Sequence, residues 1–297
     1  MKHGSLFSGI GGFDLAASWM QWENVFNCEK DVFCRRILQY YWPQTISYEN
    51  VRDFCGTKYR NLIDVLSGGF PCQPFSSAGK RKGTADERYL WPQMLRIVHE
   101  MQPSWVVGEN VSGLVNWEGG MVFRKVLANL ESEGYEVWPY ILPAGGVGAY
   151  HRRDRIFFIA CRKDKFSKLL CDPAWKKKYF SDARVWEEFE GSPQSAESSH
   201  SDSIERRKGG MHKTGSKEAK RHVSPRNTWN AGHPWENFPS QSPLCGGNDG
   251  LPRELDRITF SAWRKESLKA YGNAIVPQVG FQIFQGIERV EASLLHL

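Results

Sequence analysis

The sequence contains no apolar run that approaches the length of a membrane-spanning helix. Such a helix needs about 18 consecutive apolar residues, and the first apolar stretch, Leu6 to Ala17, already includes three glycines and an aspartate. No basic segment followed by an apolar one opens the chain, so no secretory leader is predicted. We therefore expect a soluble cytoplasmic protein without a membrane partner.

Cysteine patterns typical of zinc sites or disulfide frameworks are also missing, as are internal repeats. The seven cysteines are odd in number and irregular in spacing, and none forms a Cys-x-x-Cys pair or a zinc-like cluster with histidine. Most cysteines are expected to be reduced and buried. No metal site is predicted.

Apolar and aromatic residues are plentiful enough for a packed interior. Hydrophobic residues make up 40% and aromatic residues 13% of the 297 positions, which excludes a wholly disordered chain. A chain of this length can form one large domain, or a core with a smaller lobe.

Positive charge is concentrated in one part of the chain. Residues 151–230 contain 19 Lys/Arg against 11 Asp/Glu, whereas the counts are 14 against 15 in residues 1–150 and 6 against 7 in residues 231–297. The net charge of +6 therefore comes from a single stretch. A localised basic block suits a polyphosphate partner, and a solvated lysine-rich surface explains the same composition equally well.

Short apolar runs alternate with longer amphipathic stretches over the first 160 residues. This alternation predicts an α/β fold, with a parallel sheet covered by helices on both faces and ligands bound beyond the carboxyl ends of the strands. The expected strands are His3–Phe7, Glu23–Cys28, Asp64–Ser67, Trp105–Gly108, Glu136–Leu142 and Ile156–Cys161. The expected helices are Gly11–Met20, Asp31–Tyr41, Tyr89–Met101, Val122–Glu133, Ser267–Tyr271 and Pro277–Leu297.

A glycine-rich turn follows the first expected strand, where the sequence from Leu6 to Asp14 reads LFSGIGGFD. Glycines let the backbone approach a ligand closely and leave the N–H groups of the next helix free. Glu29 and Asp53 are expected at the ends of the next two strands, where carboxylates can accept hydrogen bonds from a ribose and an adenine amine. A nucleoside-containing cofactor is predicted, with a plain tight turn and two surface carboxylates as the alternative.

Cys72 lies between Pro71 and Pro74, directly after an expected buried strand. The prolines restrict the backbone, so the sulfur is expected on a stiff loop at the ligand-binding edge. A structural cysteine would more naturally lie within a strand or helix.

Further charged residues are expected at the same edge. Glu109 follows the strand at 105–108, and alternate residues His151, Arg153 and Arg155 would point to one face at the entrance of the last strand. Cysteine, glutamate and arginine could therefore converge on one cleft.

The order and spelling of these segments resemble the DNA cytosine-C5 methyltransferases. The resemblance covers residues 1–161 and roughly 268–297, and one departure is His151, where the family usually has glutamine. It is carried by the FSGIGG of residues 7–12, Pro71-Cys72-Gln73, Glu109-Asn110-Val111, Arg153-x-Arg155 and Gly272-Asn273-Ala274.

This resemblance implies a Rossmann-like S-adenosylmethionine-dependent methyltransferase sheet. It places the catalytic, cofactor-binding domain at residues 1–161 and 268–297, and a smaller, loop-rich target-recognition domain at residues 162–267. The basic block falls in the second domain, where its charges could neutralise DNA phosphates, although most of them taken singly are better explained as solvated surface.

The resemblance also implies a role for each candidate residue. Cys72 would attack C6 of a flipped-out cytosine, Glu109 would hold N3 and the exocyclic amine, Arg155 would bind O2, and Arg153 would support a loop or a phosphate. S-adenosylmethionine, which becomes S-adenosylhomocysteine, would be held without a metal by Phe7, Gly9, Gly11, Gly12, Glu29, Asp53, Leu90 and Asn273. DNA would be contacted by Gln73, Ser76 and His151.

The implied partner is double-stranded DNA, and the implied protein is a monomeric bacterial or phage enzyme near the nucleoid. It would serve restriction-modification, with a cognate restriction endonuclease as a second partner, or the protection of phage DNA. Two alternatives stay open: a tRNA cytosine methyltransferase with a similar core, and a catalytically dead DNA-binding or decoy protein. The presence of Cys72, Glu109 and Arg155 argues against the second, since a binding module does not need all three.

Overall fold

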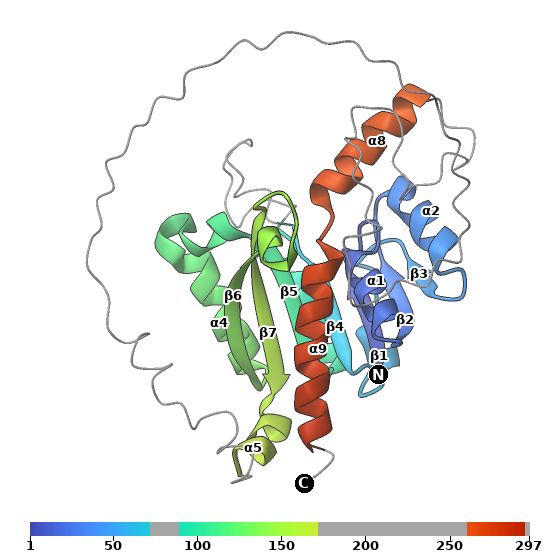
Figure 1. Ribbon diagram of the computed structural model, residues 1–297. Helices are drawn as coiled ribbons and strands as arrows, with labels where there is room; N and C mark the ends of the chain where they lie inside the picture. The colour runs from blue at the N-terminus through green and yellow to red at the C-terminus, as the bar shows by residue number, and fades with distance from the viewer. Residues whose placement is uncertain (72–88, 172–259, 295–297) are drawn as a thin grey trace, which may run out of the picture.

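The structure is a computed structural model that describes residues 1–71, 89–171 and 260–294. Its centre is a seven-stranded sheet in the order β3-β2-β1-β4-β5-β7-β6. The strands are β1 (Lys2–Leu6), β2 (Glu23–Cys28), β3 (Ile46–Tyr48), β4 (Val65–Gly69), β5 (Trp105–Val111), β6 (Tyr135–Pro143) and β7 (Asp154–Arg162). Their order along the sheet can be followed in Figure 1.

The sheet is mixed rather than wholly parallel. Strands β1 to β5 pair in parallel, whereas β7 is antiparallel to both β5 and β6. The expectation of a parallel sheet is wrong at this edge because residues 144–153, which join β6 to β7, contain only a 3-10 turn at Ala144–Val147. A parallel return would need a long crossover, usually a helix. The predicted Rossmann-like α/β fold is confirmed.

Helices cover both faces of the sheet. They are α1 (Gly12–Trp19), α2 (Val32–Tyr41), α3 (Trp91–Met101), α4 (Met121–Ser132), α5 (Lys163–Cys171), α8 (Phe260–Asn273) and α9 (Pro277–Leu294). Neighbouring strand residues point to opposite faces. Leu66 and Val106 accordingly pack with α3 and α4, whereas Val65 and Val107 pack with α1 and α9.

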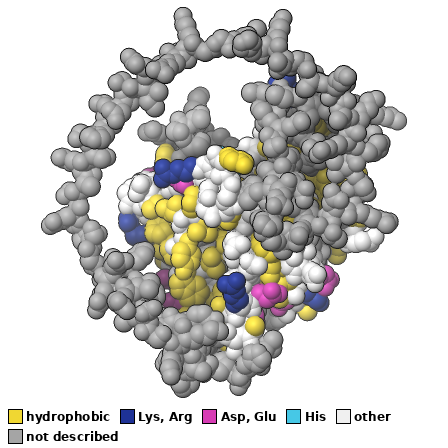
Figure 2. Space-filling model, in the orientation of Figure 1, with side chains coloured by type: hydrophobic (Ala, Val, Ile, Leu, Met, Phe, Trp, Pro, Cys, Tyr) yellow, Lys and Arg dark blue, Asp and Glu magenta, His cyan; other side chains and the backbone are white. Residues whose placement is uncertain are grey.

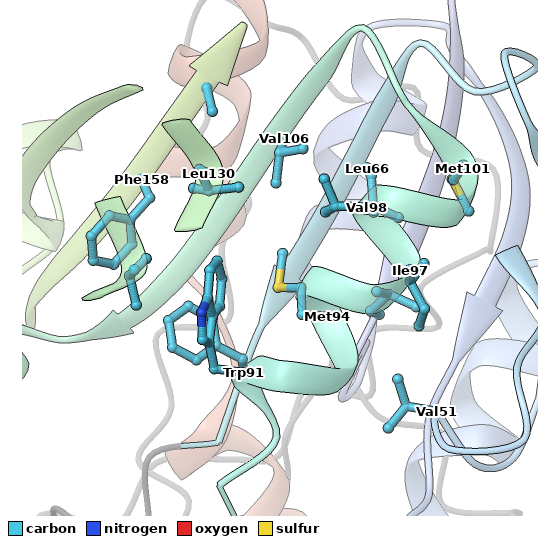
Figure 3. Close-up of a cluster of buried hydrophobic side chains, with 14 of the residues drawn as sticks. Val51, Leu66, Trp91, Met94, Ile97, Val98, Met101, Val106, Leu130 and Phe158 are labelled. Atoms are coloured by element: carbon cyan, nitrogen blue, oxygen red, sulfur yellow. The ribbon is translucent and has the colours of Figure 1, made fainter. Parts of the chain in front are cut away.

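Helix α3 presents an apolar face to the sheet. Figure 3 shows Met94 and Val98 of this helix pointing toward Leu66 of β4 and Val106 of β5, while Trp91 lies nearer Phe158 of β7. Burying side chains of this size stabilises the fold by about 1.5–3 kcal/mol each. The face fixes the position of α3 on the sheet.

The C-terminal helices return to the glycine turn. Helix α8 packs on α2 through Trp263, Ala270 and Ile37, and Lys269 pairs with Asp31 at 2.5 Å. Helix α9 then crosses the sheet beside α1 (Figure 1). Because α8 begins at residue 260, the expected domain boundary after residue 267 falls inside a helix.

The edge strand β6 is partly uncovered. Hydrophobic side chains gather over this strand in Figure 2, and Tyr140 and Ile141 are each about half exposed, at 49% and 53%.

Within the described ranges, no helix is long and apolar enough to cross a membrane.

Candidate active site

The glycine turn lies at the carboxyl end of β1, as predicted, and has an unusual backbone. Phe7, Gly9 and Gly11 all have positive φ, at 52°, 55° and 85°, a region that residues other than glycine seldom occupy. A side chain on Gly11 would also clash, since its Cβ would lie 2.5 Å from Cζ3 of Trp42. Among the described residues, no atom lies within 4 Å of a Cβ built on Gly9, so that part of the chain leaves open space in front of this part of the turn.

Glu29 follows β2, as predicted, and braces the turn. Its Oε2 accepts a hydrogen bond from the Gly9 N–H at 2.7 Å, and its Oε1 accepts one from the Asp31 N–H at 2.8 Å. The carboxylate thus ties β2 and the start of α2 to the glycine turn. Its remaining lone pairs can accept further hydrogen bonds.

Asp53 is not at the end of a strand, and that expectation is wrong. Strand β3 ends at Tyr48, and Asp53 lies five residues later in a turn, where its carboxylate accepts a hydrogen bond from Asn50 Nδ2 at 2.8 Å. Asp53 is exposed, and Leu90, at the start of α3, is half-buried against the core.

Glu109 lies inside β5, which continues to Val111 instead of ending at Gly108 as expected, and it pairs with Gly69 of β4. Its Oε1 is 3.1 Å from Nε of Arg155, and its side chain is only 13% exposed. Burial raises the pKa of Glu109 to about 7, against the opposing effect of the positive charges of Arg155 and Arg153. A carboxyl group with this pKa can hold or release a proton near neutral pH.

The chain that leads to Cys72 is held against Glu109. Asn110 Nδ2 donates a hydrogen bond to the carbonyl oxygen of Phe70 at 2.8 Å, and Phe70 is 2% exposed. A Cβ on Gly69 would lie 3.0 Å from Oε2 of Glu109, so β4 and the carboxylate are in close contact. Cys72 itself, with Gln73 and Ser76, lies outside the described residues.

The expected alternation of His151, Arg153 and Arg155 is wrong, although Glu109 and Arg155 do meet. Strand β7 begins at Asp154, and Arg153 has a φ of 38°, so the extended pattern does not reach back to residue 151. Arg153 Nη2 instead donates hydrogen bonds to the carbonyl oxygens of Gly272 and Ala274, at 3.0 and 2.5 Å. His151 is exposed.

Residues 272–276 close the site from the C-terminal side. Asn273 is the last residue of α8 and is exposed. Ile275, which no sequence motif singled out, lies between two other parts of the site. A Cβ on Gly12 would lie 2.7 Å from the Ile275 carbonyl oxygen, and one on Gly69 would lie 3.5 Å from its Cδ1. Its position directly after the Gly-Asn-Ala break was the available signal.

The four described cysteines with resolved side chains are free thiols. Cys28, Cys34 and Cys161 are buried, and burial raises the pKa of each thiol well above its usual range. Such thiols are poor nucleophiles. Cys55 is exposed and directly precedes the 3-10 turn η1 (Gly56–Tyr59).

The described residues thus bring a glycine turn, a buried Glu–Arg pair and the chain before Cys72 to one edge of the sheet. In open α/β sheets this edge is where ligands bind. Within the described ranges, no group of three or more histidine, cysteine, aspartate or glutamate side chains could hold a metal ion.

Comparisons with known proteins point to one family. Residues 1–247 match the family model of the C-5 cytosine-specific DNA methylases. A Type II methyltransferase of Bacillus subtilis, M.BsuFI, is 36% identical over 164 residues, which are 54% of this chain and 39% of that protein. Another, M.HgiCII of Herpetosiphon aurantiacus, is 33% identical over 159 residues, 53% of this chain and 36% of that protein.

The matched stretch therefore spans well under half the length of these relatives. Among solved structures, a putative DNA modification methyltransferase encoded within an Escherichia coli prophage is 25% identical, with a TM-score of 0.46 over 55% of this chain and 47% of that one. Because the family model matches more than half of the sequence, the chain belongs to the C-5 cytosine-specific DNA methylases.

Proposed function

We propose that this protein transfers a methyl group from S-adenosylmethionine to C5 of a cytosine flipped out of duplex DNA. The observation that carries the proposal is the buried Glu109–Arg155 pair, which lies against Gly69, three residues before Cys72. Three residues span at most about 11 Å. A nucleophile at position 72 is therefore tethered near the buried carboxylate of Glu109, whose pKa is raised to about 7.

The described residues fit a nucleoside cofactor. The open space before Gly9 lets a ligand approach the backbone, and Glu29 presents a half-buried carboxylate beside it. We assign the cofactor to Phe7, Gly9, Gly11 and Gly12 with Glu29 at the ribose. Asp53 at the adenine amine, Leu90 at the ring and Asn273 at the C-terminal side complete the assigned set. When bound, S-adenosylmethionine supplies an electrophilic methyl group.

Cytosine C5 is too weak a nucleophile to take up this methyl group unaided. The Cys72 thiolate adds to C6 of the base, which turns the ring into an enamine and makes C5 nucleophilic. After C5 has been methylated, a base or water removes the C5 proton, and the C6–S bond breaks to release the thiolate. The ring thereby regains its double bond, and the enzyme its nucleophile.

Glu109 and Arg155 stabilise the charge that this addition creates. A protonated Glu109 donates to N3 as negative charge builds there, and its carbonyl oxygen accepts from the exocyclic amine. Arg155, already oriented by Glu109 at 3.1 Å, binds O2 with its remaining N–H groups. Arg153 holds the 272–274 segment instead of contacting the base, since its guanidinium donates to two carbonyl oxygens there.

The DNA-facing assignments depend on the same reaction. C6 of a stacked cytosine is inaccessible to a thiolate, so the base must leave the helix. Gln73, Ser76 and His151 are assigned to DNA contacts, and residues 162–267, with most of the basic block, to target recognition. A monomer acting in restriction-modification or phage DNA protection, with or without a cognate endonuclease, is the proposed setting.

Bisulfite sequencing tests the proposal directly. The chain is expressed in cells free of cytosine-C5 methylation, and the Cys72→Ala variant serves as the control. We expect protected cytosines in one sequence context, and none with the variant. Purified protein should methylate duplex DNA in preference to tRNA. Unmethylated DNA in the presence of folded protein would overturn the proposal. Methylation of tRNA alone would show that the substrate is tRNA and not DNA.

A further inference from the structure

Helix α3 carries a polar pair, Arg96 and Glu100, beside the apolar face seen in Figure 3. The two side chains are 33% and 20% exposed and pair at 2.6 Å. All three guanidinium nitrogens of Arg96 are used. Nε donates to Gln93 Oε1 at 3.1 Å, Nη1 donates to Glu100 Oε1 and to the Phe54 carbonyl oxygen at 3.0 Å, and Nη2 donates to the Val51 carbonyl oxygen at 2.9 Å.

Glu100 completes the attachment of the same segment. Its Oε2 accepts a hydrogen bond from the Gly56 N–H at 2.7 Å. The segment also packs directly on the helix, since a Cβ on Gly56 would lie 3.1 Å from Cβ of Glu100 and 3.2 Å from the Ile97 carbonyl oxygen. Three backbone groups of residues 51–56 are thus bound by two side chains of α3.

Asp53 lies in the middle of this segment, between the two carbonyl groups that Arg96 binds. It follows β3 by five residues, so no strand pairing fixes it. Leu90, at the start of the helix that carries Arg96, would contact the same adenine. The attachment to α3 therefore sets the distance between the two residues assigned to the adenine.

We propose that Arg96, supported by Glu100, is a positioning residue for recognition of the adenine: it holds Asp53 where the carboxylate can accept from the 6-amino group. The inference rests on the proposed function for the assignment of Asp53 and Leu90. The planar guanidinium suits this task because it binds two carbonyl oxygens and a carboxylate at once. A lysine ammonium is a point charge on a flexible stem and cannot reproduce that fork.

The test measures binding of S-adenosylhomocysteine by calorimetry to the full chain and to Arg96→Met. S-inosylhomocysteine, which lacks the 6-amino group, is measured in parallel. We expect Arg96→Met to weaken the adenosyl ligand about tenfold, to leave the inosyl ligand within about twofold, and to leave kcat at saturating cofactor within about twofold. Arg124→Met is the matched control, because Arg124 of α4 donates to the Gly119 carbonyl oxygen in an exposed position.

A double-mutant cycle with Asp53→Ala shows whether Arg96 acts through Asp53. In that background Arg96→Met should cause little further loss. Arg96→Lys keeps the charge and should show a smaller, intermediate loss, so it serves as the readout if Arg96→Met does not fold. Equal weakening of both ligands, an undiminished loss in the Asp53→Ala background, or wild-type affinity in both Arg96 variants would overturn the inference. A wild-type chain that binds neither ligand would instead overturn the proposed cofactor site.

Discussion

Replacing Glu109 with glutamine should change how the stability of this protein depends on pH. Glu109→Gln keeps the shape of the side chain but removes its titration. Burial raises the pKa of Glu109 from 4.5 to about 7 in the folded chain. The folded state therefore binds a proton at Glu109 more tightly than the unfolded state does, and the resulting stabilisation is complete below pH 4.5 and lost as the pH rises through 7.

The size of the effect follows from the pKa difference. One pKa unit corresponds to about 1.4 kcal/mol, so a shift from 4.5 to about 7 corresponds to about 3 kcal/mol. The pKa of about 7 already includes the effect of Arg155, whose positive charge 3.1 Å away lowers the pKa of Glu109. We expect a measured change of about 2–3 kcal/mol.

Urea denaturation of the wild type and Glu109→Gln between pH 4.5 and 8.5 measures this change. The free energy of unfolding of the wild type minus that of the variant should fall by the stated amount over this range. Two other buried groups titrate in both proteins and cancel in the difference: Asp14, whose pKa burial raises to about 7, and His3, whose pKa burial lowers to about 4. A difference that does not vary with pH would refute the reasoning.

Three further changes probe other parts of the site. Arg155→Ala should lower kcat about a hundredfold by removing charge stabilisation at O2. It should also shift the alkaline limb of the pH–rate profile to higher pH, because Arg155 lowers the pKa of Glu109. An alkaline limb at an unchanged pH would contradict the pairing. Arg153→Ala should lower the free energy of unfolding by about 1–2 kcal/mol. It should also raise KM for the cofactor by a larger factor than it lowers kcat. A larger effect on kcat than on KM would indicate a role at the base. Gly11→Ala combines a φ of 85° with a Cβ 2.5 Å from Trp42, so thermal denaturation should show a loss of about 1–3 kcal/mol; wild-type stability would contradict it.

The elements that could be predicted from the sequence are those with a strong local signal. Strand β2 was predicted with its observed bounds, Glu23–Cys28, because the β-branched and aromatic residues Val25 and Phe26 lie in a short segment that ends before the charged pair Glu29 and Lys30. The glycine turn followed from its place directly after an apolar strand, and Glu109 was predicted at the correct edge of the sheet, although it lies inside β5 and not after it. Local pattern is sufficient where one strand end carries one functional group.

What the sequence could not show depends on long-range packing. Strand β3 is three residues long and mostly exposed, so it has little hydrophobic pattern. The antiparallel pairing of β7 depends on the absence of a crossover helix, which alternation of apolar runs does not reveal. Arg153 departs from the expected pattern because its backbone turns before the strand begins and its side chain bonds to residues about 120 positions away.

The attachment of residues 51–56 to α3 was equally hidden. Arg96 and Glu100 read as an ordinary i,i+4 pair on a helix surface. Only the folded chain shows that their partners are backbone groups some 45 residues earlier. Contacts between a side chain and a distant backbone leave no pattern in a single sequence.

Covalent trapping tests the central claim most directly. A duplex that carries 5-fluorocytosine at the methylated position is incubated with the protein and S-adenosylmethionine, and the adduct is mapped by mass spectrometry. Fluorine at C5 cannot leave as a proton does, so the C6–S bond should persist. We expect a stable adduct on Cys72 that is lost in Cys72→Ala. An adduct on another residue, or DNA methylation by Cys72→Ala, would contradict it.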